Sequence, residues 1–176
     1  MKTVAVLMAG GKSSRMGSDK ALMSIGSRPL VSILAERWQG VFDALALSVD
    51  HTKRFAHLGL DGIQMVEDAR PGGGPMAGLE TIMGAIPADR YFLIAVDLPF
   101  SSPSLAHVIC KEIGNSDVCL IRRRNGRLEP LFALYSRRCF PHIAASLGRG
   151  ERSFQHGLFP HISVREITED RGECGL

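Results

Sequence analysis

The amino-terminal segment constrains the fold of this chain more than any other stretch. An apolar run over 4–9 leads directly into a glycine-rich, basic segment that ends at Lys20. Gly10 and Gly11 have no side chains, so the backbone N–H groups of this loop can approach an anion closely. Arg15 and Lys20 add positive charge that suits a chain of phosphates better than a single carboxylate. An apolar strand that runs into such a loop predicts an α/β protein with a nucleotide-binding site.

Two commoner glycine-rich motifs do not fit this segment. A P-loop requires a glycine five positions before the Gly11-Lys12-Ser13 triplet, and that position holds Val6. A dinucleotide-binding fingerprint requires G-x-G-x-x-G, whereas Gly10 and Gly11 are adjacent and Gly17 follows only after a polar, basic stretch. The spacing therefore excludes a P-loop ATPase and removes the main support for a hydride-transferring enzyme.

Strand-like and helix-like patterns alternate along the rest of the chain. Apolar runs predict strands over 44–49, 63–66 and 91–96, and helical patterns follow over 29–39, 76–85 and from about 103. This alternation predicts a three-layer, Rossmann-like α/β fold with a mainly parallel sheet. Asn125-Gly126, between the segments 117–124 and 127–135, predicts an antiparallel hairpin added to that sheet. Pro130 lies in the second arm of the hairpin and requires a bulge or an edge position there.

Composition places the chain in a broad class. With 176 residues, 45% of them hydrophobic, we expect a single domain over 1–176. A net charge of +3 is too modest to predict nucleic-acid binding, and no apolar run is long enough to cross a membrane. The cysteines lack C-x-x-C spacing and the histidines lack zinc-ligand spacing, while the apolar surroundings of Cys119 predict a buried thiol. We therefore expect a cytoplasmic protein.

Acidic residues follow two of the predicted parallel strands. Asp68 comes shortly after the strand over 63–66, and Asp97 comes directly after the strand over 91–96. Ligands of open α/β sheets bind outside the carboxyl ends of the strands, so we expect both carboxylates to lie near the glycine-rich loop. Asp97 is the predicted metal ligand, because Mg²⁺ is commonly held by one or two carboxylates together with substrate phosphates.

Each of these features has a simpler structural interpretation. Asp97 could merely cap the helix that begins near 103, but Ser101 and Ser102 are better placed as caps. Asp68 could be only a turn former. The glycines over 72–74 fit a mobile lid or a plain connection equally well.

Four motifs in this chain resemble a known family. The segment 7–20 is similar to the signature loop of nucleotidyltransferases, L-x-G-G-x-S-x-R-M-G-x-D-K. Within that superfamily the order of motifs looks most like that of the molybdenum cofactor guanylyltransferases, and the resemblance extends to about 153. The later motifs are Gly74-Pro75-Met76-Ala77-Gly78, Val96-Asp97-Leu98-Pro99-Phe100 and Glu129-Pro130-Leu131-Phe132-Ala133-Leu134-Tyr135.

The resemblance implies an activity and a set of site residues. It implies transfer of GMP from GTP to the molybdenum cofactor, Mo-molybdopterin, with Mg²⁺ as cofactor and pyrophosphate as the leaving group. A terminal phosphate of this anionic acceptor would attack the α-phosphorus, and no protein nucleophile is needed. The predicted catalytic residues are Arg15 on the pyrophosphate side, Lys20 toward the α-phosphate, and the metal ligand Asp97. The predicted GTP-binding residues are Met8, Ala9, Gly10, Gly11, Ser13, Lys20, Asp68, Gly78 and Asp97.

Several alternatives stay open at the level of sequence. Ser48-Val49-Asp50-His51 replaces a segment that is rich in asparagine in many family members, and 167–170 is a reduced form of the family's carboxyl-terminal motif. The alternatives are a related nucleotidyltransferase that uses CTP or acts on a sugar phosphate, and a non-catalytic nucleotide-binding module. Transient contact with other cofactor-biosynthesis proteins is a further expectation. The arginines at the hairpin tip could receive an acceptor phosphate, but we favour a solvated charged tip for Arg122, Arg123, Arg124 and Arg127.

Overall fold

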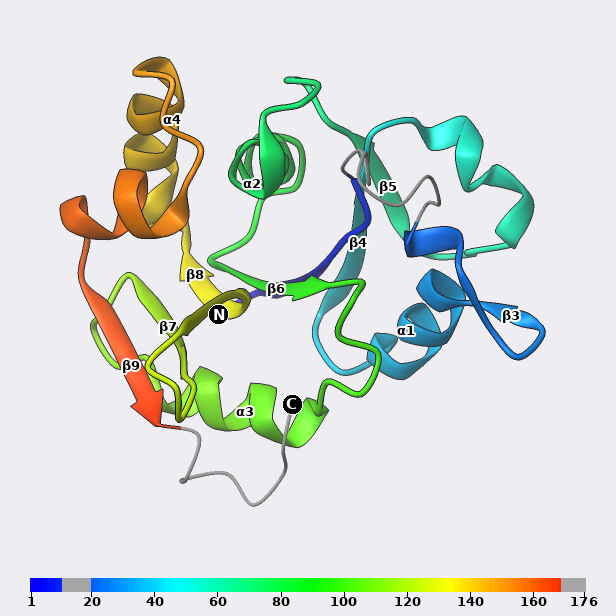
Figure 1. Cartoon of the computed structure of the whole chain (residues 1–176), viewed down its shortest axis with the longest axis horizontal. Helices are drawn as coiled ribbons and strands as arrows, with labels where there is room; N and C mark the ends of the chain where they lie inside the picture. The colour runs from blue at the N-terminus through cyan, green and yellow to red at the C-terminus, as the bar shows by residue number, and fades with distance from the viewer. Residues whose placement is uncertain (11–19, 169–176) are drawn as a thin grey trace.

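The computed structural model of the chain describes residues 1–10 and 20–168, and its main feature is a seven-stranded sheet (Figure 1). The strand order across this sheet is β5-β4-β1-β6-β8-β7-β9. The strands are β1 (Thr3–Met8), β4 (Ala44–Val49), β5 (Gln64–Glu67), β6 (Arg90–Ala95), β7 (Val118–Arg122), β8 (Leu128–Ser136) and β9 (Val164–Thr168).

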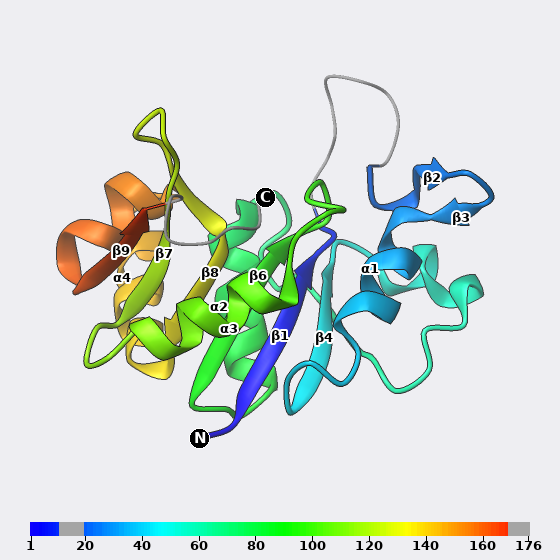
Figure 2. The ribbon, with the colours of Figure 1, turned by 90° about the horizontal axis from the view of Figure 1, so that it is seen from below.

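The four strands β5, β4, β1 and β6 are parallel to one another, and β8 pairs antiparallel with β6 and β7. Two hydrophobic cores lie on opposite faces of the sheet, one under α1 (Leu30–Trp38) and α3 (Pro103–Glu112), the other under α2 (Gly74–Ala85) and α4 (Phe140–Gly148). Figures 1 and 2 show the helices in layers on either side of the strands. The predicted three-layer α/β fold with an antiparallel addition is confirmed.

Successive residues of β1 enter different cores. Leu7 packs in the core under α1 and α3, whereas Val6 and Met8 pack in the core under α2 and α4. Side chains along a strand point alternately to opposite faces, and both faces are covered here. This explains why the whole run over 4–9 is apolar. It also places Gly10, the first residue after that run, beyond the carboxyl end of a central strand.

The β7–β8 hairpin contains a register break that accommodates Pro130. Leu120 pairs with Ala133, but Arg122 pairs with Leu128, so residues 129–132 of β8 face Ile121 alone. Residues in a bulge do not take part in the regular ladder of hydrogen bonds. Proline fits there, because it has no N–H to donate. The Pro130 carbonyl instead accepts a hydrogen bond of 2.8 Å from the hydroxyl of Tyr135. Of the two positions expected for Pro130, a bulge or a strand edge, the structure shows the bulge.

Most of the predicted elements are present, with small shifts at their ends. Helix α1 begins at Leu30 rather than Pro29, β5 begins at Gln64 rather than Ile63, and α2 begins at Gly74, two residues before Met76. Three elements were not predicted from the sequence: α4, β9 and the short hairpin of β2 (Ser24–Ile25) and β3 (Arg28–Pro29). Short helical turns connect the larger elements, namely η1 (Lys20–Leu22), η2 (Thr52–Arg54), η3 (Ala56–Leu58), η4 (Arg137–Cys139), η5 (Phe154–Leu158) and η6 (Phe159–His161).

Two expectations about the environment of the chain can be compared with the structure. Cys119 is fully buried in β7, and burial raises the pKa of its thiol to about 12, so the predicted buried thiol is confirmed. In the part of the chain that the structure describes, none of the helices has both the length and the apolar character needed to span a bilayer.

Candidate active site

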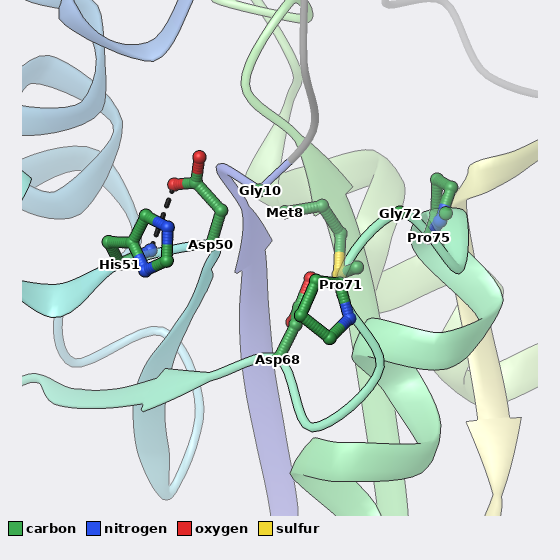
Figure 3. Close-up of a pocket in the computed structure, with 9 residues that line it drawn as sticks. Met8, Gly10, Asp50, His51, Asp68, Pro71, Gly72 and Pro75 are labelled. Carbon is green, nitrogen blue, oxygen red and sulfur yellow. Dashed lines mark hydrogen bonds between the residues drawn. The ribbon is translucent and has the colours of Figure 1, made fainter.

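A pocket of about 450 Å³ lies where the carboxyl ends of β1, β4 and β5 meet the start of α2 (Figure 3). These strands are neighbours in the sheet and run in the same direction, so the residues that follow them meet at one edge. Each strand end contributes lining residues, and the β5–α2 loop closes one side. The lining residues are Met8, Gly10, Asp50, His51, Asp68, Pro71, Gly72, Gly74 and Pro75.

The carboxyl group of Asp68 is the most constrained acidic group of the pocket. The Ser48 hydroxyl donates a hydrogen bond of 2.8 Å to its Oδ1, and its backbone N–H donates to the carbonyl of Val49 at 2.8 Å. Burial raises the pKa of Asp68; the hydrogen bond from Ser48 lowers it in part, and the nearby charges of Asp50 and Glu67 raise it further. Asp68 therefore ionises at a higher pH than an ordinary aspartate.

Two glycines permit this close arrangement. A Cβ atom at Gly10 would lie 2.9 Å from Oδ2 of Asp68. A Cβ atom at Gly78 would lie 2.6 Å from Oγ of Ser48, 2.9 Å from Cε of Met8 and 3.2 Å from Oδ1 of Asp68. Contacts below 3.0 Å force neighbouring atoms to move. Dense packing behind the pocket thus accounts for Gly78 inside α2.

Paired charges line the β4 side of the pocket. Oδ1 of Asp50 accepts a hydrogen bond of 3.0 Å from the backbone N–H of His51, and Oδ2 forms an ion pair with Arg54. Nδ1 of His51 lies 3.2 Å from Oε1 of Glu67, whose Oε2 accepts from the backbone N–H of Thr52 at 3.1 Å. Hydrogen bonds from Thr52 and His51 lower the pKa of Glu67. In the sequence, Asp50 and His51 stood out only as departures from a family pattern and were not predicted to line the pocket.

Asp97 follows β6 and lies outside the set of pocket-lining residues. Ala95, the last residue of β6, pairs with Met8 of β1, so the turn that contains Asp97 leaves the sheet at the same edge as the pocket. Its side chain is exposed. The cap of α3 is Ser102, whose Oγ accepts a hydrogen bond from the backbone N–H of Leu105 at 3.4 Å. The interpretation of Asp97 as a mere helix cap is therefore wrong.

The remaining predicted site residues fall into two groups. Ala9 is buried, and its backbone N–H donates a hydrogen bond of 2.9 Å to the carbonyl of Ser48, so it joins β1 to β4 beside the pocket. Lys20 begins η1. The predicted Gly11, Ser13 and Arg15 lie outside the described residues.

Carboxylates hold Arg122 and Arg123 of the hairpin. Nη2 of Arg123 lies 2.8 Å from Oε2 of Glu129, and Nε of Arg122 lies 2.5 Å from Oε2 of Glu166. Two guanidinium groups at the tip therefore already have acidic partners on the same sheet. This pairing favours the interpretation of a charged, solvated tip over that of a phosphate receptor.

Comparison with known proteins assigns the chain to a family. A sequence profile of the MobA-like NTP transferase domain matches residues 5–162. The chain belongs to the MobA-like NTP transferase family. This confirms the resemblance inferred from the four motifs, and it identifies the chain as a nucleotidyltransferase.

Individual members of the MobA-like family match most of the chain. The probable molybdenum cofactor guanylyltransferase of Pelotomaculum thermopropionicum is 30% identical over 170 residues, which cover 97% of this chain and 80% of that protein. The protein of the same name from Carboxydothermus hydrogenoformans is 32% identical over 166 residues, 94% of this chain and 81% of that protein. The crystal structure of molybdopterin-guanine dinucleotide biosynthesis protein A from Archaeoglobus fulgidus superposes with a TM-score of 0.80 at 20% identity, covering 96% of this chain and 84% of that one. At that identity the superposition supports the shared fold alone.

Proposed function

We propose that this nucleotidyltransferase transfers GMP from GTP to the molybdenum cofactor, forming the molybdopterin guanine dinucleotide and releasing pyrophosphate. The observation that carries this proposal is the pocket at the ends of β1, β4 and β5, where Met8 and Gly10 of the first family-like motif meet Asp68, a predicted GTP-binding residue. Its volume of about 450 Å³ suits a nucleoside. The names of the two curated relatives support guanine as the base and the molybdenum cofactor as the acceptor.

The donor nucleotide would enter the pocket with its base toward β4 and β5. Guanine presents two adjacent N–H donors, at N1 and at the exocyclic amine, and a carboxylate can accept both hydrogen bonds. Asp68 supplies such a carboxylate at the pocket wall. The phosphates would then extend from Gly10 along the glycine-rich loop, where we assign backbone N–H groups, Ser13, Arg15 and Lys20 to the phosphate oxygens.

MobA-like nucleotidyltransferases generally depend on a divalent metal, and we propose Mg²⁺ with Asp97 as its protein ligand. The donor chemistry fits, because Asp97 offers an exposed carboxylate at the sheet edge that holds the pocket, and Mg²⁺ commonly takes only one or two protein carboxylates. When bound, the ion would neutralise charge on the phosphates. No protein nucleophile takes part in the proposed reaction. The phosphate of the acceptor attacks the α-phosphorus in line, and positioning together with the charges of Arg15 and Lys20 lowers the barrier.

Nucleotide selectivity tests the donor assignment. We expect binding titrations of GTP, CTP and ATP, each with Mg²⁺, to show a clear preference for GTP. A preference for CTP would move the protein to a cytidylyl-transferring function. Absence of nucleotide binding would contradict the proposal altogether.

A further inference from the structure

Ser48 is a buried polar residue inside an otherwise apolar strand. It lies between Leu47 and Val49 in β4, and its exposed fraction is 0%. A hydroxyl group at such a position lowers stability unless it is hydrogen-bonded. The partner of this hydroxyl is Oδ1 of Asp68, at 2.8 Å, on the neighbouring strand end. The hydroxyl of this buried serine therefore satisfies its hydrogen bond at a carboxylate that lines the pocket.

Packing holds this pair in one arrangement. The side of the pair that faces α2 is filled by Gly78, where even a Cβ atom would come within 2.6 Å of Oγ of Ser48. The side that faces β1 is filled by Gly10, where a Cβ atom would come within 2.9 Å of Oδ2 of Asp68. The Asp68 carboxylate therefore has little room to rotate, and the hydroxyl fixes which oxygen faces β4.

The charged groups around Asp68 work against its ionisation. Asp50 on the β4 side and Glu67 on β5 are negative and raise the pKa of Asp68, as does burial. Both are partly compensated, Asp50 by Arg54 and Glu67 by His51. The β1 and α2 sides present Met8, Gly10 and Gly78, which carry no charge, and Glu80 of α2 is paired with Arg70. Among these surrounding groups, the Ser48 hydroxyl stabilises the charged carboxylate directly.

We propose that Ser48 is a positioning residue for base recognition, because its hydroxyl orients the Asp68 carboxylate to accept the N–H groups of guanine. This inference rests on the proposed function. The sign of its pH dependence follows from the hydrogen bond. A donor to the charged form favours ionisation, so removing the hydroxyl raises the pKa of Asp68 further. Binding that requires the carboxylate is present above that pKa and is lost as the pH falls through it.

The test compares Ser48→Ala with a matched control, Ser146→Ala. Ser146 is also fully buried and donates a hydrogen bond of 2.8 Å, but to the carbonyl of Gly157, and neither residue lines the pocket. Binding of GTP with Mg²⁺ is titrated from pH 5 to 8, together with thermal unfolding. We expect Ser48→Ala to weaken GTP binding about ten-fold at neutral pH and to lose it at a higher pH than the wild type. Ser146→Ala lowers thermal stability and leaves GTP binding unchanged.

A second pair of variants separates positioning from general loosening of the fold. In Asp68→Asn, which cannot ionise, adding Ser48→Ala causes no further pH-dependent loss of GTP affinity. If Ser48→Ala proves too unstable, Ser48→Cys, which keeps a weak donor, should bind GTP with intermediate affinity. Equal affinity and an equal pH profile in wild type and Ser48→Ala would overturn this inference alone. A wild type that binds no GTP would overturn both this inference and the proposed function.

Discussion

Around the Asp68 carboxylate, the size of single residues matters as much as their chemistry. Gly10 and Gly78 lie on two sides of the Asp68 carboxylate, and neither position has room for a Cβ atom. Ser48 occupies the third side and donates the hydrogen bond that holds the carboxylate. The two glycines and the serine together set the position of the Asp68 carboxylate, so a substitution at any of them should shift that carboxylate.

Gly78→Ala tests this crowding directly. The new methyl group would lie 2.6 Å from Oγ of Ser48, so we expect a loss of about 1–3 kcal/mol in the free energy of unfolding and weaker GTP binding. Gly84→Ala is the matched control, because it lies in the same helix and its added Cβ meets nothing within 4 Å. There alanine should stabilise the helix by about 0.5–1 kcal/mol. Urea unfolding measures both changes, and equal effects at the two positions would contradict the account.

Asp68→Asn should separate stability from binding. Because the pKa of Asp68 is raised in the folded state, its ionisation opposes folding, and this cost is present above the folded pKa and absent below the unfolded one. Asparagine removes that cost. We therefore expect the stability of the variant relative to the wild type to be higher at pH 7 than at pH 4. At pH 7 the variant should also bind GTP more weakly. Thermal unfolding at both pH values checks the sign. A relative gain that is larger at pH 4 would contradict the assignment.

At the scale of elements, local patterns predicted the strands around the pocket and the added hairpin, but not the edge strand β9. Strands β1, β4 and β6 are long buried runs, and such runs are visible in the sequence. Strand β9 reads VREIT, with Ile167 as its buried residue. Its place beside β7 depends on partners that are distant in the sequence, namely the strand β7 itself and the core in which Ile167 packs. Contacts of that kind leave no periodic signal in the sequence, which is why β9 was missed.

The β5–α2 loop is fastened on two sides, which bears on whether it is a lid or a plain connection. Nη1 of Arg152 donates a hydrogen bond of 3.0 Å to the carbonyl of Gly72, a pocket-lining residue. At the other end Nε of Arg70 lies 2.9 Å from Oε2 of Glu80 in α2. The first contact links the loop to the segment after α4. The loop is therefore held by one contact to the segment after α4 and by one contact to α2, which favours a plain connection over a mobile lid.

Arg152→Ala should loosen this wall of the pocket. We expect faster amide exchange at 72–74 and GTP binding weaker by about two- to five-fold, because an exposed hydrogen bond contributes modestly. Arg165→Ala is the control, since this exposed arginine pairs with Glu112 on the opposite side of the sheet. Amide hydrogen exchange followed by mass spectrometry resolves the difference. Unchanged exchange at 72–74 in Arg152→Ala would show that the contact does not restrain the loop.

At the scale of the whole molecule, the parallel strand order brings residues that are far apart in the sequence to one pocket. Residues after β1 and β5 were expected to converge, and Met8, Gly10 and Asp68 do line one pocket. Asp97 lies in the turn after β6 at the same edge of the sheet, but it does not line the pocket, so its role as a metal ligand stays a prediction. Family membership followed from the order of motifs. The roles of Ser48, Asp50 and His51 at the pocket could not be interpreted from sequence, because they depend on partners at the end of β5 and in η2.

Analysis of the reaction product tests the central claim most directly. The protein is incubated with molybdenum cofactor, Mg²⁺ and either GTP or CTP, and pyrophosphate and the pterin dinucleotide are quantified by mass spectrometry. Asp97→Ala is compared with Asp61→Ala, an exposed aspartate in the turn before β5, at the opposite end of that strand from the pocket. The account predicts the guanine dinucleotide with GTP, little product with CTP, a loss of at least about 100-fold in Asp97→Ala, and wild-type rates in Asp61→Ala. A cytosine dinucleotide, or no dinucleotide from a protein that binds GTP, would contradict it.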